Sequence, residues 1–307
     1  IILLVLAVVC LIAGIGLLVG QRYCSGKTQG IESSNIVTGA QNTCIAYDSA
    51  NEILIVGTHN NEAVAFKDGT EIWRQTSNGA YSAFVIDAEQ NIVYASSEDN
   101  HVYIYNISDG SAVNDINTQR RIVAMDVSKD GKIAVATSTG SSKANVLLYD
   151  KEGNELLNQK SKIKINGIEF TNDNENIIIG NNRGEIIKMD LNGQELSKYA
   201  TNYTVLQIIP YGEYHLAVCK NGGYFGFDDD LNIIRQGEIT NTAQAVVTSV
   251  GTDSDQEYIA VGTQEGYLYI LDGSDKQIYV ENTDATINAF AQDGDCLLYT
   301  SPSPRDL

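Results

Sequence analysis

The chain is poor in several residue types, and their scarcity limits the chemistry open to it. It has three prolines, three histidines, two methionines and one tryptophan in 307 residues. It contains no Cys-X-X-Cys pair and no cluster of cysteine and histidine that would suggest zinc. It also lacks a glycine-rich phosphate loop and the G-X-S-X-G turn of serine hydrolases. We therefore predict no catalytic residue, no metal site and no cofactor.

Basic charge is also scarce. The chain has 20 lysines and arginines against 39 acidic residues, a formal net charge of −19. A surface this acidic repels phosphate backbones, so we do not expect a nucleic-acid partner. Hydrophobic residues make up 43% and charged residues 19%, which is typical of a globular protein with a sizeable core.

The first twenty residues, IILLVLAVVCLIAGIGLLVG, carry no charge, and the first ionic side chain is Arg22. As a helix they would span about 30 Å, the thickness of the hydrocarbon core of a bilayer. The run is longer than the apolar part of a cleaved signal peptide, and it has no polar face for a surface helix. We predict a transmembrane anchor over residues 1–21, with the membrane contact made by residues 1–20.

The orientation of this single-pass anchor stays open. Arg22 and Lys27 follow it, which favours a cytoplasmic domain. An N-terminal anchor usually sends the following domain across the membrane, and we expect an extracytoplasmic domain. In an oxidising extracytoplasmic compartment Cys24 and Cys44 could form a disulfide, but we favour free thiols at both positions.

The rest of the chain repeats itself. Six apolar runs end on a small residue, namely Gly57, Ser96, Ala136, Gly180, Cys219 and Gly262. The period is therefore near forty residues, which is the signature of radial or solenoidal β repeats. The runs are short, rich in Ile, Val and Tyr, and bounded by Gly, Asn and Asp, so they predict strands rather than helices.

Each repeat divides into four strands, of which the small residue ends the second. The first strands are predicted at 44–48, 83–87, 121–126, 167–170, 206–209 and 245–250, and the third at 62–66, 101–105, 145–149, 185–189, 223–227 and 266–270. The fourth strands are more polar, as expected at an exposed edge, and are predicted at 71–75, 155–159, 195–199, 233–237 and 276–280. Asp150, Asp190, Asp228 and Asp272, with Asn106, follow third strands and are predicted to bond their own turns rather than a metal.

Two stretches carry a family resemblance. IVYASSEDNHVYIYNISDG, and KDGTEIW ending on Trp73, resemble the quinoprotein-like (PQQ-type) β-propeller repeat over about residues 42–295. The resemblance implies a WD40-like propeller of four-stranded blades. It does not imply a quinone, because one tryptophan cannot form that family's docking ring and its adjacent cysteine pair is absent; the GH and WD signatures of WD40 repeats are missing too.

We expect an all-β protein of four domains or segments. Residues 1–21 form the anchor, 22–41 a linker that includes a possible ring-closing strand at 32–40, and 42–295 the β-propeller. The propeller has six complete blades and the start of a seventh, which suggests seven or eight blades. Residues 296–307, CLLYTSPSPRDL, resemble a translated sequencing adapter, so we expect this tail not to be native.

The turns between second and third strands hold most of the candidate binding residues. HNNE at 59–62 and EDNH at 98–101 occupy equivalent turns, and the arginine pair at 120–121 should lie at the mouth of the central channel, where it could bind an acidic partner. Solvated loop residues, and arginines that only neutralise nearby acids, are the simpler interpretation. The candidate binding residues are His59, Asn60, Glu98, Asp99, Arg120, Arg121, Arg183 and Tyr203.

These features favour a membrane-tethered propeller that binds a protein or a component of the cell envelope through loops on one face. One alternative is an enzyme, either a degenerate quinoprotein or a glycan-active propeller. For that alternative Asp48, Asp87 and Asp126 would be the channel carboxylates to inspect first, although capping of the turn after the first strand is their simpler role. The other alternative is the extracellular sensor half of a receptor.

Overall fold

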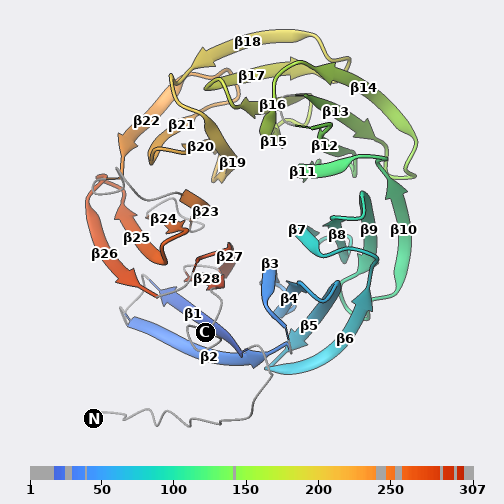
Figure 1. Cartoon of the computed structure of the whole chain (residues 1–307), viewed down its shortest axis with the longest axis vertical. Coiled ribbons are helices and arrows are strands. Elements are labelled where there is room, and N and C mark those ends of the chain that lie inside the picture. The colour runs from blue at the N-terminus through green and yellow to red at the C-terminus, as the bar shows by residue number, and fades with distance from the viewer. Residues whose placement is uncertain are drawn as a thin grey trace.

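The computed structural model describes residues 17–24, 30–38, 40–140, 143–239, 247–252, 258–283, 286–293 and 296–300. Within 17–37, 292–298 and at residue 300 only the backbone is described. This part of the chain consists of strands and turns, with no helix. Six sheets of four consecutive antiparallel strands follow one another around a ring (Figure 1). The prediction of an all-β propeller with four-stranded blades is thus confirmed.

The strands of the six blades are named by their place from the centre outward. The inner strands are β3 (Asn42–Asp48), β7 (Tyr81–Asp87), β11 (Arg121–Val127), β15 (Ile165–Phe170), β19 (Val205–Tyr211) and β23 (Val247–Thr252). The second strands are β4 (Ile53–Thr58), β8 (Ile92–Ser97), β12 (Ile133–Ser138), β16 (Asn176–Asn181), β20 (Tyr214–Cys219) and β24 (Tyr258–Thr263). The third strands are β5 (Glu62–Lys67), β9 (His101–Asn106), β13 (Ala144–Tyr149), β17 (Glu185–Asp190), β21 (Gly223–Phe227) and β25 (Tyr267–Asp272). The outer strands are β6 (Thr70–Thr76), β10 (Ala112–Asn117), β14 (Glu155–Ser161), β18 (Glu195–Ala200), β22 (Ile233–Glu238) and β26 (Gln277–Asn282).

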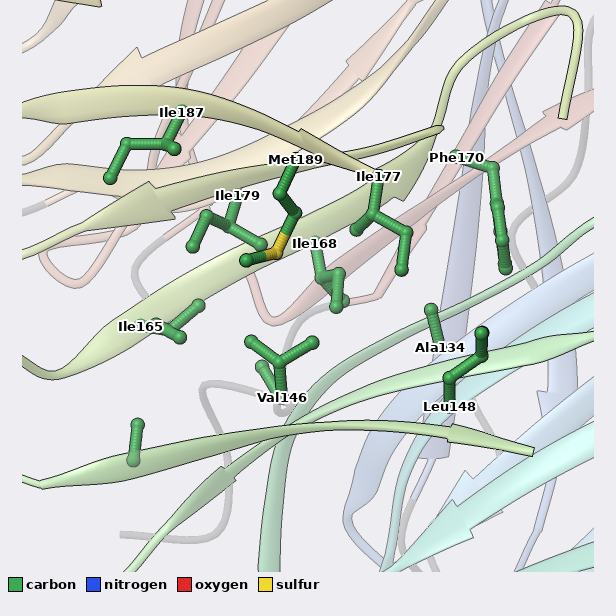
Figure 2. Close-up of a cluster of buried hydrophobic side chains, with 12 residues drawn as sticks. Ala134, Val146, Leu148, Ile165, Ile168, Phe170, Ile177, Ile179, Ile187 and Met189 are labelled. Atoms are coloured by element: carbon green, nitrogen blue, oxygen red, sulfur yellow. The ribbon is translucent and has the colours of Figure 1, made fainter. Parts of the chain in front are cut away.

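The hydrophobic core lies between blades rather than inside them. One cluster packs Ala134, Val146 and Leu148 of the third blade (β11–β14) against Ile168 and other residues of the fourth blade (β15–β18), as Figure 2 shows. The second and third strands are buried along most of their length because each has a neighbouring blade on both faces. The outer strands alternate between exposed and half-buried residues. The predicted rise in polarity toward the outer edge is confirmed.

The glycine near the end of the second strand has a steric cause in the first, fourth and sixth blades. A Cβ added at Gly57 would lie 2.6 Å from Sγ of Cys44 and 3.0 Å from Cβ of Tyr81, which opens the next blade. A Cβ added at Gly262 would lie 2.6 Å from Cβ of Ile287. Real Cβ atoms do not approach so closely. The near-forty-residue period of small residues therefore includes the positions, such as Gly57 and Gly262, where one blade passes closely over the next.

Bulges in the inner strands connect neighbouring blades near the centre of the ring. The register shifts at Thr43, Asn166 and Thr248, so one extra residue stands opposite each second strand. Each of these side chains donates a hydrogen bond to a backbone carbonyl of the following inner strand or its approach: Thr43 to Tyr81 (2.5 Å), Asn166 to Val205 (2.7 Å) and Thr248 to Ile287 (2.7 Å). Asn288 donates to the carbonyl of Asn42 (3.1 Å) and so joins the end of the ring to its start.

The single tryptophan also connects two blades. Trp73 Nε1 donates to the carbonyl of Ile107 in the next blade (2.6 Å), and a Cβ at Gly110 would touch the indole ring. The equivalent position of other outer strands makes comparable contacts with different side chains. Asn114 donates to the carbonyl of Glu152 (3.1 Å) and Arg235 to the carbonyl of Asp272 (2.5 Å). This position of the outer strand thus links neighbouring blades, although tryptophan does not recur at it from blade to blade.

A further four-stranded sheet combines both ends of the chain. Its order is β2 (Gly30–Val37), β1 (Leu17–Cys24), β28 (Cys296–Thr300) and β27 (Ala289–Asp293). β27 contacts β23 of the sixth blade and β3 of the first. Residues 17–21 of the expected anchor are therefore in a strand, the expected linker holds the end of β1 and all of β2, and 296–299 of the expected non-native tail pair with β1. Residues 1–16 and 301–307 lie outside the described residues.

In the described part of the chain, no helix has the length and apolar character needed to cross a bilayer. Cys44 and Cys219 are buried free thiols, so the favoured prediction of an unpaired Cys44 is confirmed. Cys24 stands opposite Cys296 in the strand register.

Candidate functional site

Strand direction gives the ring two distinct faces. Because the four strands of a blade are antiparallel, the second-to-third turns and the outer-to-inner connections emerge on one face, here called the upper face. The inner-to-second and third-to-outer turns emerge on the other, here called the lower face. All eight candidate binding residues belong to second-to-third turns or outer-to-inner connections, so they share the upper face.

The structure places these eight residues around the rim rather than in one pocket. Arg121 opens inner strand β11, and its Nη2 lies 3.7 Å from Oε1 of Glu98 on the preceding blade. Both side chains are largely exposed, so the pair contributes little to stability and stays accessible. His59 and Asn60 are exposed too, but no hydrogen bond or ion pair among the described residues joins their turn to Glu98 and Asp99.

Asp99 has a structural role. Its carboxylate accepts hydrogen bonds from the Tyr103 hydroxyl (2.7 Å) and the backbone N–H of Asn78 (3.0 Å) and His101 (3.2 Å). Burial favours the neutral form, but these bonds, with one from Ser97, outweigh it and lower the pKa of Asp99. His101 is not the simple solvated residue that we expected, because its Nδ1 lies 2.9 Å from Asp115 and its ring stacks on Tyr103.

A repeated hydroxyl fixes the upper rim. Thr118 donates to the carbonyls of Asn100 (2.8 Å) and Arg120 (2.7 Å), and Thr201 donates to those of Gly184 (3.0 Å) and Tyr203 (2.8 Å). Each hydroxyl thereby ties a connection between blades to a second-to-third turn. Equivalent hydroxyls stand at Thr38, Ser77, Ser161 and Thr283. We missed this motif in the sequence, although a Ser or Thr recurs just after or at the end of every fourth strand except β22, where Ile239 stands in its place.

The three channel carboxylates behave differently from one another. Asp48 accepts from the backbone N–H of Ala50 (3.1 Å) and Asp87 from that of Gln90 (3.0 Å), so both cap their own turns as predicted. Asp126 instead accepts from the backbone N–H of Phe170 in the next blade (2.7 Å). The prediction that Asp126 only caps its own turn was therefore wrong. Burial raises the pKa of Asp126 to about 6.

Asp126 belongs to a group of ionisable side chains between the third, fourth and fifth blades. His215, at the start of β20, is 1% exposed. Its Nδ1 lies 3.0 Å from Oε2 of Glu169 at the end of β15, and its Nε2 lies 2.7 Å from Oδ1 of Asp229. Phe227 stacks on its ring. Sequence reasoning missed this group because His215 looked isolated; the available signal was a Glu and a His inside apolar runs of consecutive repeats, GIEF and YHLAV.

The protonation of this group follows from burial and charge. Burial disfavours the imidazolium, but the carboxylates of Glu169 and Asp229 outweigh it and raise the pKa of His215 to about 9. Burial raises the pKa of Glu169 to about 7. Burial alone would raise the pKa of Asp229, but its bonds to His215 and Asn172 outweigh burial and lower this pKa. His215 is thus a buried cation that joins the fourth and fifth blades, and its enclosure gives no access to a substrate.

The third-to-outer turns confirm the predicted role of their aspartates. Oδ1 of Asp150 accepts from the backbone N–H of Asn154 (2.8 Å), and Asp190, Asp228 and Asp272 accept in the same way from Gln194, Asn232 and Lys276. Within the described residues no group of three or more potential ligands is placed to hold a metal ion. An open groove on the lower face lies between Lys129, Lys132, Asp173 and Asn192.

Comparison with known proteins adds the fold but not an activity. Residues 27–168 match the model of a family of unknown function, DUF5711. No curated protein matches the chain. Among solved structures, Chaetomium thermophilum Raptor superposes with a TM-score of 0.72 at 12% identity, over 94% of this chain and 29% of that one. The Myceliophteria thermophila Cps50 (Swd1) β-propeller domain gives 0.72 at 9% identity, over 92% of this chain and 100% of that domain. The chain thus spans less than a third of the Raptor structure, and at these identities the likeness shows a WD40-like β-propeller fold alone.

Proposed function

We propose that this protein is a membrane-tethered β-propeller that binds another protein or a component of the cell envelope through its upper face. The observation that carries the proposal is the gathering of all eight candidate residues on one rigid rim, which repeated hydroxyl and backbone hydrogen bonds hold in place. A rigid ring that presents variable turns on one face is suited to recognition, because little conformational entropy is lost on binding.

The tether is part of this proposal. Residues 1–16, which precede β1, are uncharged, and we propose that they form the membrane-embedded part of the tether of an extracytoplasmic propeller. We further propose that the sheet β2–β1–β28–β27 is a seventh blade of the quinoprotein-like type. The contacts of β27 with β23 and β3, and the hydrogen bond from Asn288 to Asn42, support this closure.

Photo-crosslinking in native membranes tests the proposed face. A photoreactive residue at position 203, where Tyr203 is 49% exposed on the upper face, should give an adduct of defined mass. The same residue at position 192, on the lower face of the same blade, should not. Arg120→Gln with Arg121→Gln should weaken the upper-face adduct. Equal adducts from positions 203 and 192 would contradict the proposal.

A further inference from the structure

The two faces of the ring differ in charge. Cations gather on the upper face of the third, fourth and fifth blades, at Arg120, Arg121, Lys143, Lys162, Lys164, Arg183 and Lys220. The lower face carries an acidic residue in turn after turn, such as Asp109, Asp150, Glu152, Asp190, Asp228 and Asp272. The net charge of −19 is therefore not spread evenly, and a basic sector stands out on an otherwise acidic disc.

The cations of the basic sector are free to act on something outside the chain. Among the residues that the structure describes, Arg121 alone of these seven lies within ion-pair distance of a carboxylate, and that pair with Glu98 is long and exposed. On the lower face Lys132 is neutralised locally by Asp130, while Lys151 forms only a long and exposed pair with Glu152. The positive charge of the basic sector is thus not needed for contacts within the fold.

The N-terminal segment joins the propeller on the same face. β27 runs as an inner strand does, from the upper to the lower face, and β28 returns antiparallel to it. β1 is antiparallel to β28, so it starts at the upper face with Leu17. The apolar residues 1–16 therefore precede a strand that enters from the upper face, between the sixth and first blades and across the ring from the basic sector (Figure 1).

We propose that the basic sector docks on the anionic headgroup layer of the bilayer that holds the N-terminal segment, so that the upper face lies against the membrane. The inference rests on the proposed tether and names the envelope component that the upper face binds. A tether at one side of the face raises the effective concentration of the opposite side at the lipid surface. Each Lys or Arg near an anionic surface adds attraction, and the acidic lower face is repelled from it.

The arrangement favours a lipid surface over an acidic protein. The seven cations are spread along the rim of three blades rather than around a pocket, and the described groove lies on the other face. A diffuse row of cations suits a planar layer of anions. Tyr203 is exposed among them, and tyrosine is enriched where protein meets the headgroup region.

The test uses the full chain in vesicles of neutral phosphatidylcholine, or of the same lipid with phosphatidylglycerol, each containing a headgroup-linked quencher. A fluorophore is attached at Asn182→Cys on the upper face or at Asn192→Cys on the lower face of the fourth blade, with Cys10, Cys24 and Cys296 replaced by Ser. Cys44 and Cys219 are buried and should not react. We expect quenching at position 182 to rise about two-fold or more in anionic vesicles and to fall again in about 0.5 M NaCl. Quenching at position 192 should not respond.

Two charge variants provide a matched comparison. Replacing Arg120, Lys162, Lys164 and Arg183 by Gln should abolish the rise at position 182. Replacing Lys67, Lys129, Lys151 and Lys276 of the lower face by Gln, with the same change in net charge, should leave it intact. An equal loss in both variants would overturn the docking.

The remaining outcomes separate the two proposals. Equal quenching in neutral and anionic vesicles, for a chain that resists alkaline carbonate, would overturn the docking and leave the tether standing. Release of the chain by carbonate would overturn the tether. Binding of polyglutamate to the upper face without any effect of lipid composition would assign the basic sector to an acidic protein instead.

Discussion

At the scale of single residues, one small side chain in five of the six repeats decides how closely two blades approach. Gly57 and Gly262 leave no room for a methyl group, because the next inner strand lies directly over them. Ser96 and Ala136 occupy the same place in the register of their blades, and both are fully or almost fully buried. In the fifth blade Val218 stands there, and Cys219 lies one residue further along β20. Closely packed interiors tolerate little added volume, so a larger side chain at Gly57, Gly180 or Gly262 would push two blades apart.

Gly57→Ala should destabilise the protein. The new methyl group would meet Cys44, Tyr81 and Thr43 at about 3 Å or less, and we expect a loss of about 1–3 kcal/mol in the free energy of unfolding. Urea unfolding followed by the fluorescence of Trp73 measures it. Gly223→Ala is the control, since the nearest atom would lie 3.5 Å away and the change should be small. Equal effects of the two substitutions would refute the steric explanation.

At the scale of elements, the outer strands protect their own edges. In each blade the register shifts by one residue, and the extra residue is an exposed aliphatic side chain: Ile72, Val113, Leu156, Leu196, Ile234 and Ile278. A bulge interrupts the row of free backbone groups that another strand would need for pairing. Six apolar residues are thus exposed as a consequence of edge protection, without forming a continuous patch.

Also at this scale, the contacts of His215 join the fourth and fifth blades and make their association depend on pH. In the folded state the pKa of His215 is raised to about 9, above its ordinary value of 6.5, so the folded state binds this proton more tightly than the unfolded state. The stabilisation is complete below pH 6.5 and is lost as the pH rises toward 9. The raised pKa values of Glu169 and Asp126 act with the same sign, because the folded state also holds those protons more tightly.

We therefore expect the free energy of unfolding to fall from about pH 5 to pH 9, with His215 contributing about 2–3 kcal/mol of the decrease above pH 6.5. In His215→Asn the slope between pH 6.5 and 9 should largely disappear, whereas His59→Asn, at an exposed turn, should keep it. Urea titrations at a series of pH values measure the slope. A wild-type protein whose stability rises over this range would show that the ion pairs do not hold His215 protonated.

At the scale of the whole molecule, the ring was readable from the sequence because each blade repeats the same physical requirements. Apolar runs of four to six residues, a small residue where blades touch and Asp-bearing turns recur with one period, so strand positions and turn roles followed from spacing. The place of Asp126, Glu169 and His215 in one group did not follow, because it depends on which strands of three blades meet. The sequence pattern within one repeat does not show which side chains of neighbouring blades come into contact.

The candidate site was predictable to the same extent. Alternating strand direction places every second-to-third turn and every outer-to-inner connection on one face, which is why Arg121, Arg183 and Tyr203 share the upper face. The engagement of Asp99 by Tyr103 and Asn78, and of His101 by Asp115, could not be foreseen, since these bonds depend on side-chain positions across strands and blades. The contrast in charge between the faces emerges only after each turn is assigned to a face.

Hydrogen–deuterium exchange of the full chain in anionic and neutral bilayers tests most directly whether the upper face is the working surface. The account predicts that backbone amides in the connections at 117–121, 161–164 and 201–204 exchange more slowly in the anionic bilayer. The turns at 150–154 and 191–194 should exchange at the same rate in both. Protection of those lower-face turns, with the upper connections unchanged, would contradict the account.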